Sequence, residues 1–218
     1  MRLSIQVKTR QHQVCRFAAS MNGQLILQLT FFKGQCMGQT NQTITLGGGC
    51  FWCTEAVYVQ VTGVLDVESG YCNGQTQHPT YEQVCSGSTG HNEVVKLVYD
   101  PDQVSVREIL EIFFVIHDPT TRNAQGHDHG TQYRSGIYFT TPEQQQEALA
   151  LIDELTRSGV YPRAIVTEVL PQANYWPAED YHQDFFEKHP EQAYCLAVAA
   201  PKVAKFRKTF ARLQKPGR

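Results

Sequence analysis

The sequence predicts an α+β domain: a two-layer, ferredoxin-like split βαβ sheet with additional C-terminal helices and coil. Two observations predict it. Strand-like and helix-like segments follow one another between residues 44 and 140 in the order β-α-β-β-α-β, which is the order of that sheet. The hydrophobic share is 41% and the charged share 18%, which is typical of a compact domain. No apolar run approaches the ~18–20 residues of a membrane-spanning helix, so the sequence excludes one.

Each element follows from local signals. Three glycines, residues 47–49, separate the first strand from a helix that Gly63 ends. Ser105 and Glu108 form a capping box that opens the second helix. The elements are predicted in chain order as strand 44–46, helix 51–60, strands 64–71 and 93–99, a helix from Ser105 to about 116, strand 136–140, a helix from Thr141-Pro142 to Gly159, and strand 164–170.

The chain divides into three parts by composition. Residues 1–43 are rich in Gln and lack acids, and we expect a poorly ordered extension or an overextended start with Met37 as the true first residue. A secretory signal and an organelle transit peptide are the alternatives, although the only apolar patch, residues 25–27, is too interrupted for a typical signal core. Residues 44–200 are predicted to form the catalytic domain, and residues 201–218 a basic C-terminal tail.

Charge and cysteine content narrow the function. The net charge is −2, but all of the acidic residues lie within residues 55–200 and the two ends are basic. An acidic body is a poor match for nucleic acid, because affinity for nucleic acid depends on neutralising phosphates. Seven cysteines in 218 residues are an odd number and too dilute for a disulfide scaffold. We therefore expect a reducing compartment, the cytoplasm, and at least one working thiol.

The most informative segment is GGGCFWC, residues 47–53. Its glycines permit a tight turn that places Cys50 at the N-terminus of a helix, where unpaired amide protons and the helix dipole favour a thiolate. The dipole contributes roughly 0.3–1 kcal/mol, which lowers a thiol pKa by about one unit at most. Bound substrate or nearby donors must therefore supply more. Phe51 and Trp52 would form an apolar wall beside the sulfur, which neither a phosphate-binding loop nor a dinucleotide fingerprint needs.

Several segments, in order along residues 44–195, together resemble the A-type peptide methionine sulfoxide reductases. They are GGGCFW (47–52), GY (70–71), PTYEQVCSG (79–87), GHNEV (90–94), HDPT (117–120), DHGTQYRS (128–135), WPAE (176–179) and YHQ (181–183). The resemblance implies reduction of methionine-S-sulfoxide, in proteins and as the free amino acid, in the repair of oxidative damage. It implies that the enzyme needs no cofactor, that thioredoxin or dithiothreitol recycles it, and that it has no membrane partner. We expect a monomer.

The resemblance also implies roles for individual residues. Cys50 matches the family's nucleophile and Glu93 its acid, while Phe51 and Trp52 match the slot for the S-methyl group. Three further polar residues match the family's oxyanion donors and a supporting acid: Tyr81, Tyr133 and Asp128. Period two in the strand places Glu93 on the face of Val95, Leu97 and Tyr99, opposite the face of Lys96. Glu93 should therefore point inward, and a desolvated carboxyl keeps its proton, as a general acid requires.

Two cysteines are candidates to resolve the sulfenic acid that the attack leaves on Cys50. The resemblance implies a resolving cysteine near the C-terminus, and Cys195 matches it, in a segment expected to be mobile. Cys53 is the second candidate, because it completes a C-x-x-C pair with Cys50. We favour Cys195 and expect Cys72 and Cys85 to be packing thiols.

Two other functions stay open from the residues alone. A thiol–disulfide oxidoreductase would use the Cys50–Cys53 pair and would have no need of Glu93. A structural zinc module would use the same two cysteines with His127 and His129. The sequence favours the reductase, without a metal site.

Overall fold

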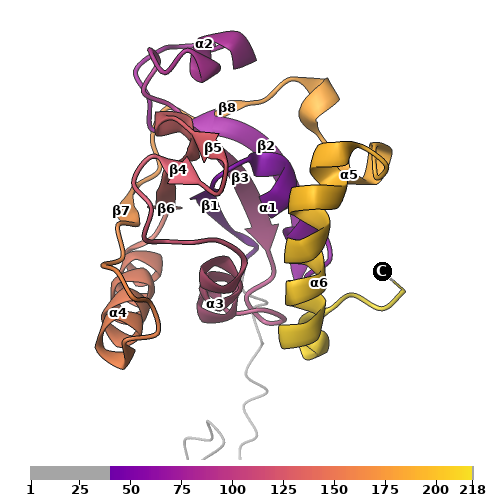
Figure 1. Cartoon of the computed structure of the whole chain (residues 1–218). Helices are drawn as coiled ribbons and strands as arrows, with labels where there is room; N and C mark the ends of the chain where they lie inside the picture. The colour runs from indigo at the N-terminus through magenta and orange to yellow at the C-terminus, as the bar shows by residue number, and fades with distance from the viewer. Residues whose placement is uncertain (1–39, 218) are drawn as a thin grey trace, which may run out of the picture. The chain divides into compact units, whose positions relative to one another are not determined.

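A computed structural model describes residues 40–217 of the chain (Figure 1). The first strand, β1, spans Gln42–Gly48, so the domain begins two residues before the predicted boundary. Residues 1–39 of the expected N-terminal extension lie outside the described residues. Among those that are described, no helix has the length and apolarity to cross a lipid bilayer.

The predicted ferredoxin-like sheet is confirmed and extended at both edges. Its central strands lie in the order β6-β1-β3-β2, and all their pairings are antiparallel. A parallel strand, β7, is added beyond β6, and a short strand, β8, pairs with β2 at the other edge. The bounds are β2 Val64–Cys72, β3 Asn92–Tyr99, β6 Ser135–Phe139, β7 Glu168–Pro171 and β8 Trp176–Pro177, with a separate two-stranded ribbon of β4 Ala124–Gln125 and β5 Asp128–His129.

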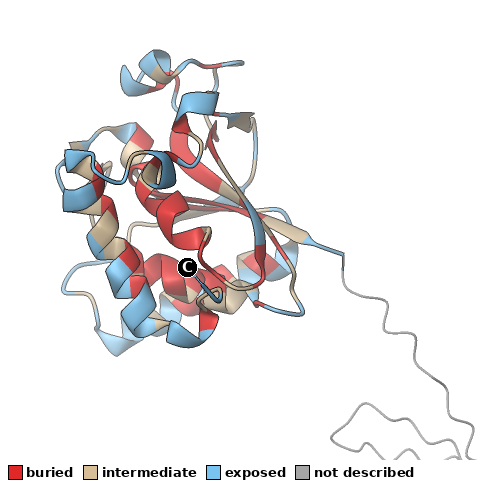
Figure 2. Ribbon diagram, turned by 90° about the vertical axis from the view of Figure 1, so that its right-hand side faces the viewer, coloured by how far each residue is buried: buried red, intermediate tan, exposed pale blue. Residues whose placement is uncertain are grey.

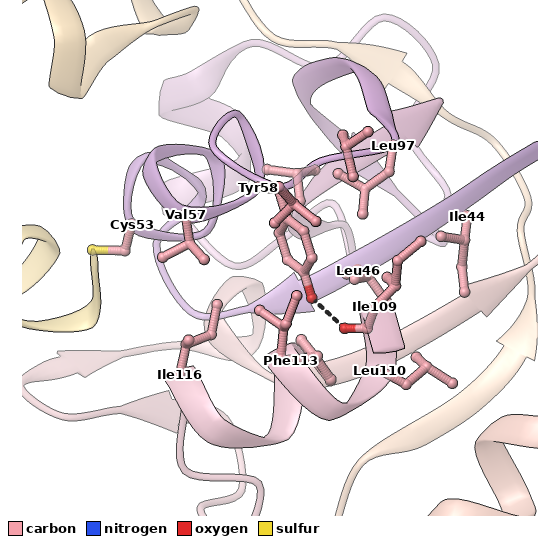
Figure 3. Close-up of a cluster of buried hydrophobic side chains, with 14 of the residues drawn as sticks. Ile44, Leu46, Cys53, Val57, Tyr58, Leu97, Ile109, Leu110, Phe113 and Ile116 are labelled. Carbon is pink, nitrogen blue, oxygen red and sulfur yellow. Dashed lines mark hydrogen bonds between the residues drawn. The ribbon is translucent and has the colours of Figure 1, made fainter. Parts of the chain in front are cut away.

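Two helices supply the predicted second layer, α1 (Phe51–Tyr58) and α3 (Val106–Ile116). The Ser105–Glu108 capping box of α3 is present as expected. Both helices pack apolar side chains against the sheet, and the Tyr58 hydroxyl donates to the Ile109 carbonyl at 2.8 Å across their contact (Figure 3). A longer helix, α4 (Pro142–Ser158), ends at Gly159 in the left-handed conformation, as the glycine predicted.

The expectation of a basic C-terminal tail is wrong. Residues Ala200–Thr209 form a helix, α6, that packs against α1 and α3, and Figure 2 shows buried positions along it. Val203 and Phe206 stand three positions apart on one helix face, and both are buried in the main core. The surrounding lysines and arginines lie on the remaining surface of the helix, so the charge count concealed an amphipathic helix.

Short elements complete the chain between β8 and α6. The segments not yet given are α2 Tyr81–Cys85, the 3₁₀ turns Thr131–Tyr133, Asp180–His182 and Ala211–Leu213, helix α5 Phe185–Lys188, and a π-helical turn Cys195–Ala199. Helix α5 and the turn Cys195–Ala199 contact α1, as α6 does.

Candidate active site

Cys50 stands at the N-cap of α1, as the glycine triplet predicted. Gly49 makes the turn with φ +89°, in the left-handed region that favours glycine. A Cβ on Gly49 would lie 2.6 Å from the Gln125 side chain, so the loop before α1 is also closely packed. Cys50 is 8% exposed, so the residue is almost enclosed by the fold.

Glu93 points into the interior beside α1, which confirms the face assigned by strand periodicity. It lies on β3, is 1% exposed, and accepts a hydrogen bond at 3.3 Å from the backbone N–H of Phe51 through Oε2. Its Oε1 is buried and has no hydrogen-bond partner within residues 40–217. Burial raises the pKa of Glu93 to about 8, although the Phe51 N–H opposes the rise and the nearby Asp128 adds to it. Glu93 is therefore mainly protonated at neutral pH.

The surroundings of Cys50 favour the protonated thiol, whereas the sequence predicted that the helix N-terminus would favour the thiolate. Burial raises the pKa of Cys50 well above its usual value, and the hydrogen bond with Cys53 and the charge of Glu93 raise it further. Desolvation thus outweighs the helix dipole, whose effect is limited to about one pKa unit. The thiol is therefore the resting form of Cys50.

Phe51 and Trp52 form an aromatic wall beside Cys50. Phe51 is fully buried, with its ring centroid 5.9 Å from that of Tyr71, while Trp52 is half-buried. Phe185 stacks on the Trp52 indole at 3.6 Å with an interplanar angle of 6°. Tyr194 meets the same indole edge-on at 5.9 Å. Together these rings make the surroundings of the first turn of α1 apolar.

Tyr81 and Tyr133 approach the site from two different segments. Tyr81 begins α2, and Glu179 accepts its backbone N–H at 2.9 Å; Tyr133 ends the turn before β6. Burial raises the pKa of both hydroxyls, and the negative charge of Glu93 raises it further in each. Both tyrosines thus keep their protons and remain hydrogen-bond donors near Glu93.

Asp128 is connected to the cysteine pair through a residue that sequence reasoning missed. The Tyr194 hydroxyl donates to Oδ2 of Asp128 at 2.7 Å and accepts from the Cys53 thiol at 3.9 Å. Tyr194 comes from the C-terminal segment, which folds back over α1. In the sequence, Tyr194 is marked only by its position directly before Cys195, and that position predicts no role for its hydroxyl.

His182 is a second residue with no role predicted from sequence. It is 1% exposed and accepts the indole N–H of Trp52 on Nδ1 at 3.2 Å. Burial lowers the pKa of His182, so its ring is neutral near pH 7. An indole N–H is only a donor, which places the imidazole proton on Nε2. His182 thereby fixes the orientation of the Trp52 ring.

The two candidate resolving cysteines occupy different places. Cys53 lies one helical turn after Cys50 and shares a hydrogen bond with it, which lowers the pKa of Cys53. Cys195 is fully buried at the start of the π-helical turn, within the fold and not in an extended arm. Cys72 is buried, as expected of a packing thiol, whereas Cys85 is exposed on α2, against that expectation.

His127 and His129 do not converge with the cysteines. Both histidines are exposed on and beside the β4–β5 ribbon, whereas Cys50 and Cys53 are buried. Across residues 40–217, no cluster of three or more His, Cys, Asp or Glu side chains has an arrangement that could hold a metal ion.

Comparison with known proteins places this geometry in a family. The family model described as peptide methionine sulfoxide reductase matches residues 42–214. A peptide methionine sulfoxide reductase from Polynucleobacter asymbioticus is 54% identical, covering 81% of this chain and 93% of the relative. One from Deinococcus radiodurans is 46% identical, covering 84% and 89%.

Solved structures agree with the sequence relatives. Reduced Mxr1 from Saccharomyces cerevisiae superimposes with a TM-score of 0.66 at 36% identity, covering 71% of this chain and 89% of that one. Methionine sulfoxide reductase A from Corynebacterium diphtheriae gives a TM-score of 0.63 at 37% identity, covering 70% and 76%.

Proposed function

Because this chain belongs to the peptide methionine sulfoxide reductase family, we propose that Cys50 attacks the sulfoxide sulfur of its substrate while Glu93 protonates the sulfoxide oxygen. The chain is a peptide-methionine (S)-S-oxide reductase. The observation that carries the assignment of roles is a protonated, buried carboxyl, with one unpaired oxygen among the described residues, beside a cysteine at a helix N-terminus.

The proposed first step is balanced in protons and electrons. The Cys50 sulfur forms a bond to the sulfoxide sulfur as Glu93 gives its proton to the sulfoxide oxygen and takes up the proton of the Cys50 thiol in the same step. The oxygen then passes to the cysteine, leaving a thioether and a sulfenic acid; cysteine sulfur is oxidised by two electrons and substrate sulfur reduced by two. The proton that the Cys50 thiol releases is the one that restores Glu93. Raised pKa values on both groups suit this exchange, because each group begins the cycle protonated.

Tyr81 and Tyr133 are proposed to donate to the sulfoxide oxygen alongside Glu93. Preorganised donors aimed at developing charge stabilise a transition state more than a ground state. Phe51 and Trp52 are proposed to receive the S-methyl group, and Asp128 to support the site through Tyr194. Burial of Phe51 and the stacking of Trp52 support a slot of fixed shape.

Cys53 is proposed as the residue that resolves the sulfenic acid, in preference to Cys195. Its thiol already shares a hydrogen bond with Cys50, whereas Cys195 would have to leave a buried position in a helical turn. Condensation of the sulfenic acid with the Cys53 thiol forms a disulfide and releases water. A dithiol reductant such as thioredoxin then reduces that disulfide, which accords with a reducing compartment, the cytoplasm.

Cysteine variants distinguish the two resolvers. After one turnover without external reductant, a peptide map of the wild type should show Cys50 linked to Cys53. Cys53→Ser should accumulate a sulfenic acid and slow cycling with thioredoxin, while Cys195→Ser cycles at the wild-type rate. Linkage of Cys50 to Cys195 in the wild type would instead assign the resolving role to Cys195.

Substrate choice tests the proposed activity directly. With dithiothreitol as reductant, the enzyme should convert methionine-S-sulfoxide to methionine, both as free amino acid and within an oxidised protein, and leave the R epimer unchanged. Chiral chromatography of the two epimers measures this. Consumption of the R epimer at an equal rate would contradict the proposal.

A further inference from the structure

Glu55 is a buried carboxyl that the chemistry above does not use. It lies on α1, one turn after the cysteine and aromatic residues of the site, and is 2% exposed. Carboxylates are rarely buried without partners, because desolvation of the charge is costly. The groups that hydrogen-bond to the Glu55 carboxyl therefore explain why it is buried.

Three donors surround the Glu55 carboxyl. Oε1 accepts the Ser69 hydroxyl at 3.2 Å and the backbone N–H of Asp184 at 2.9 Å, and Oε2 accepts the backbone N–H of Phe185 at 3.1 Å. Burial raises the pKa of Glu55 to about 7, and the two backbone N–H groups oppose that rise. The carboxyl thus ties α1 both to β2 and to the segment that enters α5.

The tie replaces a missing helix cap. Asp184 occupies the N-cap position of α5 with a left-handed φ of 55° and makes no side-chain capping bond of its own. The first N–H groups of a helix need acceptors from outside the helix. Glu55 is the acceptor for the backbone N–H groups of Asp184 and Phe185. The position of this turn therefore depends on a side chain from α1.

Phe185 connects this tie to the site. Its backbone N–H is held by Glu55, while its ring covers one face of the Trp52 indole at 3.6 Å. Gln183, directly before Asp184, also holds this segment to β2, since its side chain pairs with both the backbone N–H and the carbonyl of Ser69 at 2.9 and 3.0 Å. The turn that carries Phe185 is therefore anchored at three consecutive residues, Gln183 to β2 and Asp184 and Phe185 to Glu55.

We propose that Glu55 is a positioning residue, which holds Phe185 against Trp52 and so fixes the width of the methyl slot. The proposal rests on the proposed role of Trp52 as a wall of that slot. The hydrogen bonds of the Glu55 carboxyl go to Ser69, Asp184 and Phe185, so its loss should affect binding of the S-methyl group and leave the acid and the nucleophile in place.

The test is a double-mutant cycle between Glu55→Gln and Phe185→Leu. A glutamine offers one acceptor oxygen in place of two, so one backbone N–H loses its partner and the Phe185 ring is released. Each single variant should raise KM for dabsylated methionine-S-sulfoxide about tenfold with kcat little changed, the pattern of lost uniform binding. Since both act through one contact, the double variant should also show about a tenfold rise.

A second readout follows the indole itself. In a Trp176→Phe background Trp52 is the only tryptophan, because the chain holds two. Glu55→Gln should then shift Trp52 emission in the same direction as Phe185→Leu. Glu143→Gln, at an exposed position on α4, should leave both KM and emission unchanged.

Three results would overturn the proposal. A multiplicative, about hundredfold rise of KM in the double variant would show that the two residues act independently. A Glu55→Gln protein with lowered Tm but unchanged KM and emission would show a purely structural role. Should Glu55→Gln fail to fold, Ser69→Ala removes one donor from the same carboxyl and should raise KM about threefold, in the range of one lost hydrogen bond. An unchanged KM in that variant contradicts the proposal. Wild-type turnover of the S epimer in the same assay separates these results from failure of the proposed function.

Discussion

The backbone N–H of Phe51 donates to one oxygen of Glu93 at 3.3 Å, and the other oxygen of that carboxyl is buried with no partner in the part of the chain that the structure describes. One contact thus fixes the acid of β3 relative to the first residue of the helix that carries Cys50. The bonded oxygen is held as an acceptor. The unpaired one is the natural position for the proton that the reaction consumes.

Activity should fall as pH rises through the pKa of Glu93. That pKa is about 8 because of burial, so the proton of the acid is present below pH 8 and lost above it. Wild-type kcat, measured between pH 6 and 10 with dithiothreitol, should decline above about pH 8. Glu93→Gln should lower kcat by roughly 10²–10⁴-fold and abolish the alkaline decline. A wild-type kcat that rises steadily to pH 10 would exclude Glu93 as the acid.

The raised pKa of Glu93 should make the folded protein less stable at alkaline pH. The folded-state pKa of this carboxyl, about 8, lies above the usual value of 4.5, so its contribution is fully present below pH 4.5 and is lost as pH rises through 8. Between pH 5 and 9 the free energy of unfolding of wild type should therefore fall relative to that of Glu93→Gln by about 3–5 kcal/mol. Urea denaturation at both pH values measures it. Equal pH dependence in the two proteins would contradict a raised pKa, and Glu143→Gln controls for loss of a carboxylate.

How much of the site the sequence predicts depends on how local each contact is. The Cys50 position follows from a glycine turn before a helix, and the orientation of Glu93 from period two in one strand. Both signals lie within a few residues. Tyr194 and His182 meet α1 from segments more than 120 residues away, and nothing local specifies those contacts.

The C-terminus shows how composition can mislead. Residues 201–218 have seven basic residues and no acid, which favoured a solvated tail. Val203 and Phe206 nevertheless form one buried face of α6. A periodicity test over this short segment would have detected the face that the charge count concealed.

Tyr194→Phe should slow the step that follows sulfoxide reduction. The hydroxyl accepts from the Cys53 thiol while it donates to Asp128, so its loss releases the orientation of Cys53. Loss of free thiols should slow about three- to tenfold, in the range of one lost hydrogen bond, and should slow more than methionine formation in a single turnover. Stopped-flow mixing with rapid thiol quenching separates the two rates.

The matched control for that variant is Tyr161→Phe. This variant also removes a hydrogen-bonded hydroxyl, because the Tyr161 hydroxyl donates to the Phe114 carbonyl in the last turn of α3. Both rates should match wild type there. Equal rates of thiol loss in Tyr194→Phe and wild type would show that Tyr194 does not position Cys53.

The central claim is that the sulfur of Cys50 takes up the sulfoxide oxygen. Reduced enzyme mixed with excess methionine-S-sulfoxide and no external reductant should form about one methionine per chain in a rapid burst, because each sulfenic acid records one oxygen transferred. Cys53→Ser should keep this burst and Cys50→Ser should lack it. A burst of normal size and rate in Cys50→Ser would contradict the account.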